Sequence, residues 1–222
     1  MRRLTYVMLL SASLAVPAVG SAAPKPSGAT YEVSFERAWS QATHPLDWPG
    51  AAAHFPAAIG ATHNGKYAMF AVGGIATPGL QALAERGLSS PFDSELDLAK
   101  GRGLVGTIFT LDTILSAGGS SSARFKATDA HSMVSFAAML APSPDWFTGV
   151  SSVPLKRHGK WIDAETITIY AWDAGTNAAT TYKADKIAID PFVPIGVSAA
   201  PMFVEGGAKV PVGTVTLRRV RR

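Results

Sequence analysis

Short segments with the period of a β-strand, separated by glycine- and proline-rich turns, recur along the whole of this 222-residue chain. In the first of them Tyr31, Val33 and Phe35 alternate with polar residues, which is the pattern of a half-buried strand. Turn-forming clusters such as GGSSS at 118–122 lie between later segments. Many short strands joined by tight turns predict an all-β fold, an antiparallel β-sandwich. Further strands are expected at 67–72, 106–111, 123–127, 134–140, 166–172, 180–183 and 213–219.

One short helix is expected within this β-rich pattern. Thr77 is a suitable N-cap, Pro78 suits the first helical position, and Gly87 follows the last helical residue, Arg86. The next stretch, residues 88–103, is charged and rich in turn formers, so it predicts either a long loop or a weak helix.

The first residues resemble an export signal. Arg2 and Arg3 precede a mostly apolar stretch at 4–19, and small residues follow it, so we expect a signal peptide at 1–22. An uncleaved membrane anchor is the alternative, but the apolar stretch is shorter than the ~20 residues that a spanning helix needs. We therefore expect an exported bacterial protein, secreted or periplasmic, with a lead-in at 23–30 and one domain at 31–222 that does not span a membrane.

Cysteine is absent from the chain, so no disulfide can stabilise an exported fold of this kind. Packing must hold it, with a bound metal ion as a further possible source of stability. The positive net charge of +4 comes from the two ends of the chain, because the signal carries two arginines and the last five residues carry four. The C-terminal arginines could contact phosphate or lipopolysaccharide, although a solvated terminus is the favoured interpretation. No basic face with interleaved aromatic residues follows from the pattern, so nucleic-acid binding is not expected.

Two of the expected strands lie next to carboxylates. The apolar run at 134–140 leads through a double-proline turn to Asp145, and the strand at 166–172 leads to Asp173 in the turn DAGTN, which ends at Asn177. Carboxylate and amide oxygens brought together at loop tips are the ligands that Ca²⁺ prefers. Asp145, Asp173 and Asn177 are therefore the candidate metal ligands. The alternative is that Asp173 and Asn177 form an Asx turn and that Asp145 caps a loop.

Histidine and tryptophan offer weaker candidates. His44, His54 and His63 are not spaced as a zinc site, so structural histidines are the favoured interpretation. The tryptophans are expected to pack in or over the sandwich, and Trp146 is the most plausible member of a sugar-stacking platform. The sequence has none of the motifs GxSxG, SxxK, HExxH or P-loop, and no cysteine nucleophile, so an enzyme is not expected.

Two segments carry a specific resemblance to a known family. APSPDWFTGV at 141–150 and YAWDAGTN at 170–177 resemble the spondin-N domain of F-spondin and mindin, with weaker similarity at 31–45, 54–64 and 210–220. The resemblance implies a C2-like β-sandwich. It also implies that Asp145, Asp173 and Asn177 correspond to the ligands of one Ca²⁺ ion, with an acid usual at the position of Asn177.

The resemblance further implies a role in adhesion, recognition or matrix binding, so we expect a module that binds a glycan or protein outside the cytoplasm. Two alternatives stay open at this stage. One is a hydrolase that acts on envelope glycans or lipids, and the other is a structural envelope protein without a specific ligand. A pair of acids in a deep cleft, ~5 to ~10 Å apart, would favour a glycosidase. An oxygen cage at a loop tip would favour binding.

Overall fold

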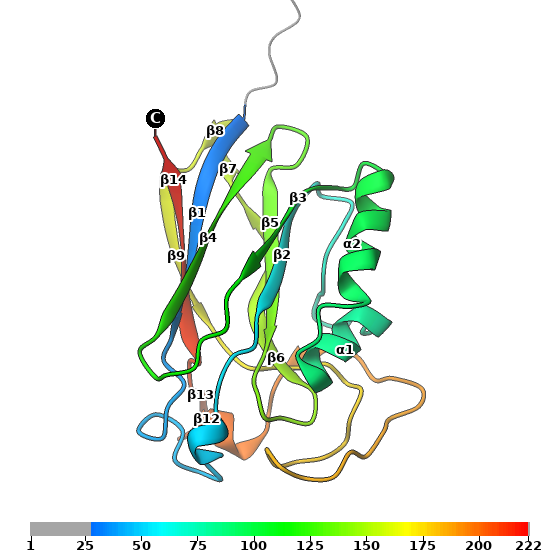
Figure 1. The fold of residues 1–222 in the computed structure, drawn as a ribbon, viewed down its shortest axis with the longest axis vertical. Coiled ribbons are helices and arrows are strands. Elements are labelled where there is room, and N and C mark those ends of the chain that lie inside the picture. Colours follow the sequence, from blue (N-terminus) through cyan, green and yellow to red (C-terminus); the bar gives the residue numbers. More distant parts are fainter. Residues whose placement is uncertain (1–27, 222) are drawn as a thin grey trace, which may run out of the picture.

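Two antiparallel sheets pack face to face in the computed structural model, which describes residues 28–221 (Figure 1). The four-stranded sheet has the order β4 (Ser120–Thr128), β1 (Gly28–Arg37), β14 (Gly213–Val220) and β9 (Ala164–Ile169). The six-stranded sheet has the order β11 (Gly196–Val197), β10 (Trp172–Asp173), β6 (Trp146–Pro154), β5 (Met133–Met139), β2 (Ala58–His63) and β3 (Val105–Leu111). The all-β antiparallel sandwich is therefore confirmed.

Smaller elements complete the fold. Two hairpins, β7 (Lys156–Arg157) with β8 (Lys160–Trp161) and β12 (Val204–Glu205) with β13 (Ala208–Lys209), lie at opposite ends of the sandwich (Figure 1). Short 3-10 helices cover Gly50–Ala52 and Pro201–Phe203. The predicted signal peptide at 1–22 lies outside the described residues. Within those residues, none of the helices has the length and apolarity that a membrane span requires.

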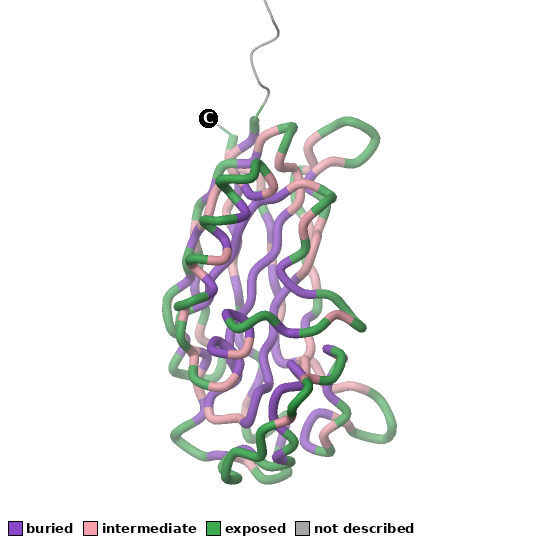
Figure 2. Tube along the Cα trace, turned by 90° about the vertical axis from the view of Figure 1, so that its right-hand side faces the viewer, coloured by how far each residue is buried: buried purple, intermediate pink, exposed green. Residues whose placement is uncertain are grey.

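The main core lies between the two sheets. Alternate residues of β1, among them Tyr31, Val33 and Phe35, are almost completely buried there, as the strand period predicts. Their rings meet those of the opposite sheet, where the Phe35 and Phe136 ring centroids are 5.8 Å apart. Figure 2 shows this buried interior running along the long axis of the molecule.

A second core lies on the other face of the six-stranded sheet, beneath helices α1 (Pro78–Arg86) and α2 (Phe92–Gly101) (Figure 1). Leu80 and Leu83 of α1 and Leu96 of α2 are buried in this cluster. Because apolar layers cover both faces of the sheet, every residue of β2 is buried and β5 is buried along almost its whole length. Near-continuous apolar strands of this kind are the consequence of burial on two faces.

Helix α1 begins and ends where the sequence predicts. The Thr77 hydroxyl accepts a hydrogen bond from Leu80 N at 3.1 Å, and Gly87 adopts the left-handed conformation at the C-cap. The segment at 88–103 contains α2, so the helix predicted as one alternative for it is confirmed and the long loop is wrong. Glu95 of α2 accepts hydrogen bonds from the Thr77 hydroxyl at 2.6 Å and from Gly79 N at 2.7 Å, which joins the two helices.

Two of the expected strands are wrong. Residues 67–72 form a loop whose Met69 and Phe70 are buried in the second core, and residues 180–183 form a turn whose Tyr182 is buried in the main core. In both places apolar side chains of a loop pack into a core. The apolar sequence there reflects this burial and not pairing in a sheet. Conversely, β2 and β6 are strands that the sequence pattern did not separate, because continuous burial removes the alternation.

The expected strand at 166–172 divides between the two sheets. Its first part is β9, which pairs with β14, whereas Trp172 pairs with Phe147 of β6 in the other sheet. The crossing occurs at Tyr170 and Ala171, where the Thr148 hydroxyl donates to the Tyr170 carbonyl at 2.8 Å. This change of sheet places Asp173 directly opposite Trp146 in the β-ladder.

We expect Gly149→Ala to be severely destabilising. Gly149 has φ of +149°, and an added Cβ would lie 2.0 Å from the Phe136 carbonyl oxygen of the neighbouring strand. Strand separation would be needed to relieve this overlap, so the free energy of unfolding should fall by about 3 kcal/mol or more. Urea denaturation of the purified variant measures the loss.

Gly159→Ala is the matched control. Gly159 also has a positive φ, +76°, but no atom lies within 4 Å of its added Cβ. Only backbone strain of about 1 kcal/mol should appear. Equal losses for the two variants would show that crowding at Gly149 contributes nothing.

Candidate metal centre

Asp145 lies in the loop that enters β6 and is completely buried. Its Oδ2 accepts hydrogen bonds from Thr176 N at 2.8 Å, Asn177 N at 3.0 Å and the Thr176 hydroxyl at 3.3 Å. Its backbone carbonyl accepts from Ala174 N at 3.2 Å. One carboxylate thus fastens the loop before β6 to the turn after β10.

The other carboxylate oxygen of Asp145, Oδ1, is buried and has no hydrogen-bond partner. Burial, and after it the negative charge of Asp173, raises the pKa of Asp145 to about 6, although the donors on Oδ2 oppose the rise. A buried carboxylate with one unsatisfied oxygen and an acidic neighbour is unfavourable at neutral pH. A cation bound between the two acids would remove both penalties.

Asp173 is the acidic neighbour. Its Oδ1 accepts a hydrogen bond from Gly175 N at 2.9 Å, which is the Asx turn considered above. The turn depends on Gly175, whose φ is +73° and whose added Cβ would lie 2.1 Å from the Val193 carbonyl oxygen. The Asx turn engages only Oδ1, so Asp173 Oδ2 forms no hydrogen bond with another described residue.

Asn177 is buried and holds its own loop together. Its Oδ1 accepts from Ala179 N and Ile187 N, each at 3.0 Å, and its Nδ2 donates to the Pro144 carbonyl at 3.3 Å. An amide oxygen has two lone pairs, and both are engaged here. Coordination of a metal by this oxygen would require one of the two backbone donors to move away.

A pocket of about 270 Å³ opens beside these residues, and Asp173, Asn177 and Trp146 lie on its wall together with Val193 and Pro201. Asp145 Oδ1 and Asp173 Oδ2 are the oxygens that fit a hard cation such as Ca²⁺. In residues 28–221, histidine, cysteine, aspartate and glutamate side chains form no group of three that could hold a metal. A calcium ion here would therefore take its remaining oxygens from backbone carbonyls and water.

The sequence pattern did not reveal the role of Thr176. Its N–H and hydroxyl both bind Asp145 Oδ2, so it orients the buried carboxylate from the opposite loop. The turn DAGTN contained the only available signal, since Gly175 and Thr176 stand between the two predicted ligands.

The histidines serve separate structural roles. His63 Nε2 lies 2.8 Å from the Ser135 hydroxyl inside the six-stranded sheet, and His54 Nδ1 lies 2.8 Å from the Ala52 carbonyl. His44 Nδ1 lies 2.9 Å from the Thr43 hydroxyl, and its ring packs edge-on against Phe203. His44 Nε2 is buried and faces the Val210 backbone without a hydrogen bond of normal geometry.

Trp146 does not form a sugar-stacking platform. It is 1% exposed and its ring packs against Tyr182 and Phe203, with centroids 5.4 and 5.0 Å away. Trp39 joins the same aromatic cluster, and its Nε1 donates to the Tyr182 hydroxyl at 3.3 Å. This aromatic cluster adjoins the two acids, because Trp146 directly follows Asp145 and pairs with Asp173 in the β-ladder.

His44 predicts a loss of stability in mild acid. Burial lowers the pKa of His44 from 6.5 to about 4, so the folded state favours the neutral ring. The unfolded chain binds the extra proton as the pH falls from 6.5 to 4, and the contribution lost by pH 4 is on the order of 3 kcal/mol. His44→Phe should reduce the dependence of the unfolding free energy on pH between 6.5 and 4, relative to the wild-type protein. Urea denaturation at a series of pH values measures both profiles. A parallel pair of profiles would contradict this assignment.

Comparison with known proteins places these features in a family. The Spondin_N family model matches residues 29–200. Spondin-2 of Rattus norvegicus is 32% identical over 187 residues, which covers 78% of this chain and 56% of the relative. Spondin-1 of Xenopus laevis is 30% identical over 209 residues, which covers 87% of this chain and 25% of the relative. Spondin-2 of Homo sapiens is 30% identical over 207 residues, covering 87% of this chain and 62% of the relative.

The chain thus spans between a quarter and about three fifths of the length of these relatives. The names of these relatives specify no catalytic activity. The family match ends at residue 200, whereas β14 pairs with both β1 and β9. The folded unit therefore extends beyond the matched segment to at least Val220. By its match over residues 29–200, this chain belongs to the spondin-N domain family.

Proposed function

We propose that this chain is an exported calcium-binding recognition module of the adhesion or matrix type. The observation that carries the metal assignment is the buried, unpartnered Oδ1 of Asp145 beside the Asp173 carboxylate. Asp145 and Asp173 supply the charged oxygens of one Ca²⁺ site. Asn177 shapes the loop around them and, as the sequence predicts, is the third candidate ligand.

Calcium would act here by joining loops. Asp145 precedes a central strand of the six-stranded sheet, whereas Asp173 follows the crossing from the other sheet. Binding of both acids by one ion neutralises their repulsion and fixes the loop 173–187 against the sandwich. A fixed loop presents a defined surface to a glycan or protein, which supports a recognition role for this end of the domain.

The hydrolase alternative has less support. A glycosidase needs two acids that reach a substrate in an open cleft. Asp145 is fully buried and its Oδ2 is occupied by three donors from the opposite loop, so it is badly placed to meet a substrate. A structural envelope protein without a ligand stays an alternative, and calcium-dependent binding of a partner would distinguish it.

The calcium site predicts two separate effects of one substitution, one in chelator and one in Ca²⁺. In chelator, Asp145→Asn removes an unfavourable buried charge, so the melting temperature should rise. The rise corresponds to about 1–3 kcal/mol at pH 8, given a folded-state pKa of about 6. In the unchanged chain, Ca²⁺ at a hundredfold excess over Kd should add about 2.7 kcal/mol. That gain should vanish in Asp145→Asn.

Asp173→Asn is the companion variant for this experiment, because it tests the second acid of the site. It should also abolish the calcium-dependent rise, but it should stabilise the chelated protein less, because Asp173 is only partly buried. Melting curves of the unchanged chain that coincide with and without Ca²⁺ over a wide concentration range would contradict the proposal.

Asn177→Asp tests the third position. An aspartate keeps the two acceptors toward Ala179 N and Ile187 N, adds a charge near the ion, and loses the donor to the Pro144 carbonyl. We expect tighter Ca²⁺ binding, since ligand charge tunes affinity, together with lower stability in chelator. Calorimetric titration and parallel melting curves measure both effects. Unchanged calcium affinity would remove Asn177 from the site.

A further inference from the structure

Eight basic side chains belong to the half of the sandwich that holds the start of β1, the second halves of β4 and β14, and the β7–β8 hairpin. Figure 1 shows these segments together at one end of the molecule. Four acids lie among these side chains, so this set of residues carries a formal charge of +4. We call this surface the basic end. Its basic residues are Arg124, Lys126, Lys156, Arg157, Lys160, Arg218, Arg219 and Arg221, and its acids are Glu32, Asp129, Asp163 and Glu165.

Each acid of the basic end is engaged by a cation. Glu32 binds both Arg124 and Arg218, at 3.0 and 2.9 Å, and holds them on the outer face of the four-stranded sheet. The other three ion pairs are Lys156–Asp129, Arg157–Glu165 and Arg221–Asp163. Three further cations, Lys126, Lys160 and Arg219, form no ion pair with another residue of the described chain, so the positive charge of this end is not neutralised internally.

A pocket of about 570 Å³ lies within this surface. Its wall includes the cations Lys126, Arg219 and Arg221 and the residues Thr30 and Thr128. Ammonium, guanidinium and hydroxyl groups are the donors that bind phosphate oxygens. The pocket therefore has the size and chemistry to receive phosphate headgroups.

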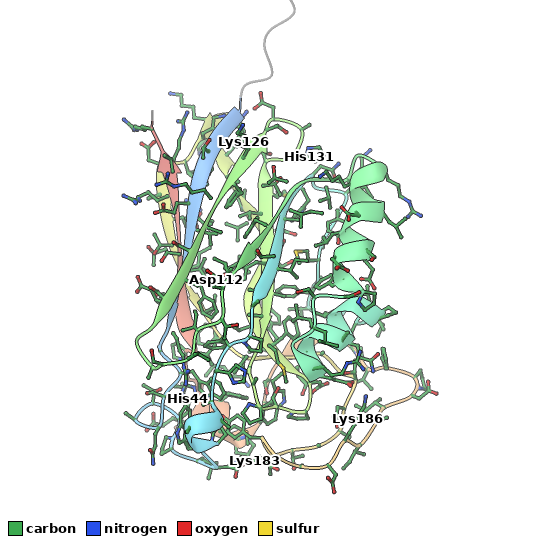
Figure 3. The ribbon with its side chains drawn as sticks, viewed as in Figure 1. His44, Asp112, Lys126, His131, Lys183 and Lys186 are labelled. Atoms are coloured by element: carbon green, nitrogen blue, oxygen red, sulfur yellow. The ribbon has the colours of Figure 1, made fainter. Side chains whose placement is uncertain are left out.

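The charge of the remaining described chain has the opposite sign. Outside the basic end it carries eight basic residues and twelve acids. The nine residues of β6 join the two ends, since Asp145 precedes the strand and Lys156 follows it. Their length of ~30 Å separates the basic end from the candidate metal centre. Figure 3 shows Lys126 near the basic end and Lys183 near the other. Beside a negatively charged plane, such a molecule orients with its basic end inward.

We propose that the basic end docks on the phosphate groups of an anionic lipid bilayer and leaves the calcium loops facing away from it. The charge of the surface is complementary to such a bilayer. Gly28, the first described residue, also lies at this end. The docking does not require a bound metal.

The test is sedimentation with lipid vesicles. Because residues 28–221 contain both cores, the chain from residue 23 onward is the form to use, free of the apolar segment at 4–19. We expect binding to phosphatidylcholine vesicles that contain about one third phosphatidylglycerol, weakening with salt and unchanged by chelator. Each removed cation should weaken binding roughly fivefold, so Lys126→Gln with Lys160→Gln should cost roughly twenty-five-fold.

Lys183→Gln with Lys209→Gln is the matched control, because it removes the same charge at the opposite end of the sandwich. It should leave vesicle binding almost unchanged. Equal losses for the two double variants, or no binding to the anionic vesicles at low salt, would overturn the proposal. Binding to soluble polyphosphate without binding to the vesicles would overturn it too, and would assign the basic end to a polymer. Every one of these binding measurements can be run in chelator. A failure of the docking proposal can therefore be told apart from a failure of the calcium site.

Discussion

The six-stranded sheet is buried on both of its faces, and the rest of the structure depends on that arrangement. One face meets the four-stranded sheet and the other meets α1 and α2, so β2 and β5 have no room for polar side chains except where hydrogen bonds satisfy them, as between His63 and Ser135. Close packing on two sides also explains Gly60, where an added Cβ would lie 2.5 Å from the Phe109 ring. Without disulfides, this double layer is what makes the sandwich a rigid base for its loops.

The candidate metal centre is a product of that base. The chain leaves the four-stranded sheet after Ile169 and enters the six-stranded sheet at Trp172, so the turn that follows meets the loop before β6. One oxygen of Asp145, Oδ2, accepts hydrogen bonds from the backbone N–H groups of Thr176 and Asn177. The other oxygen, Oδ1, has no hydrogen-bond partner. The same carboxylate thus holds two loops together through Oδ2 and carries an unsatisfied hydrogen-bond acceptor in Oδ1. A bound cation would resolve that conflict, which is why we propose these loops as the recognition surface of this spondin-N domain.

The two ends of the sandwich differ in chemistry as well as in position. At one end the loops carry the buried Asp145, the partly buried Asp173 and an aromatic cluster formed by Trp39, Trp146 and Tyr182. At the other, antiparallel pairing brings Arg124 and Arg218 to either side of Glu32. In an antiparallel pair the start of one strand lies beside the end of its neighbour. Charged residues near these termini therefore collect at one end of the sheet.

The sequence by itself determined the sandwich and the boundaries of α1, because strand period and capping residues act over a few neighbouring positions. It also singled out Asp145 and Asp173 as candidate ligands through the turns in which they stand. It did not separate β2 and β6, since continuous burial removes the alternation on which the pattern depends. It assigned strands to the loop around Phe70 and the turn around Tyr182, because the apolar residues there pack into the two cores without pairing in a sheet. Only the tertiary structure decided that one expected strand divides between the two sheets. It also decided that Thr176 orients Asp145 and that distant arginines and lysines meet at one end, because these contacts join residues separated by tens of positions in the chain.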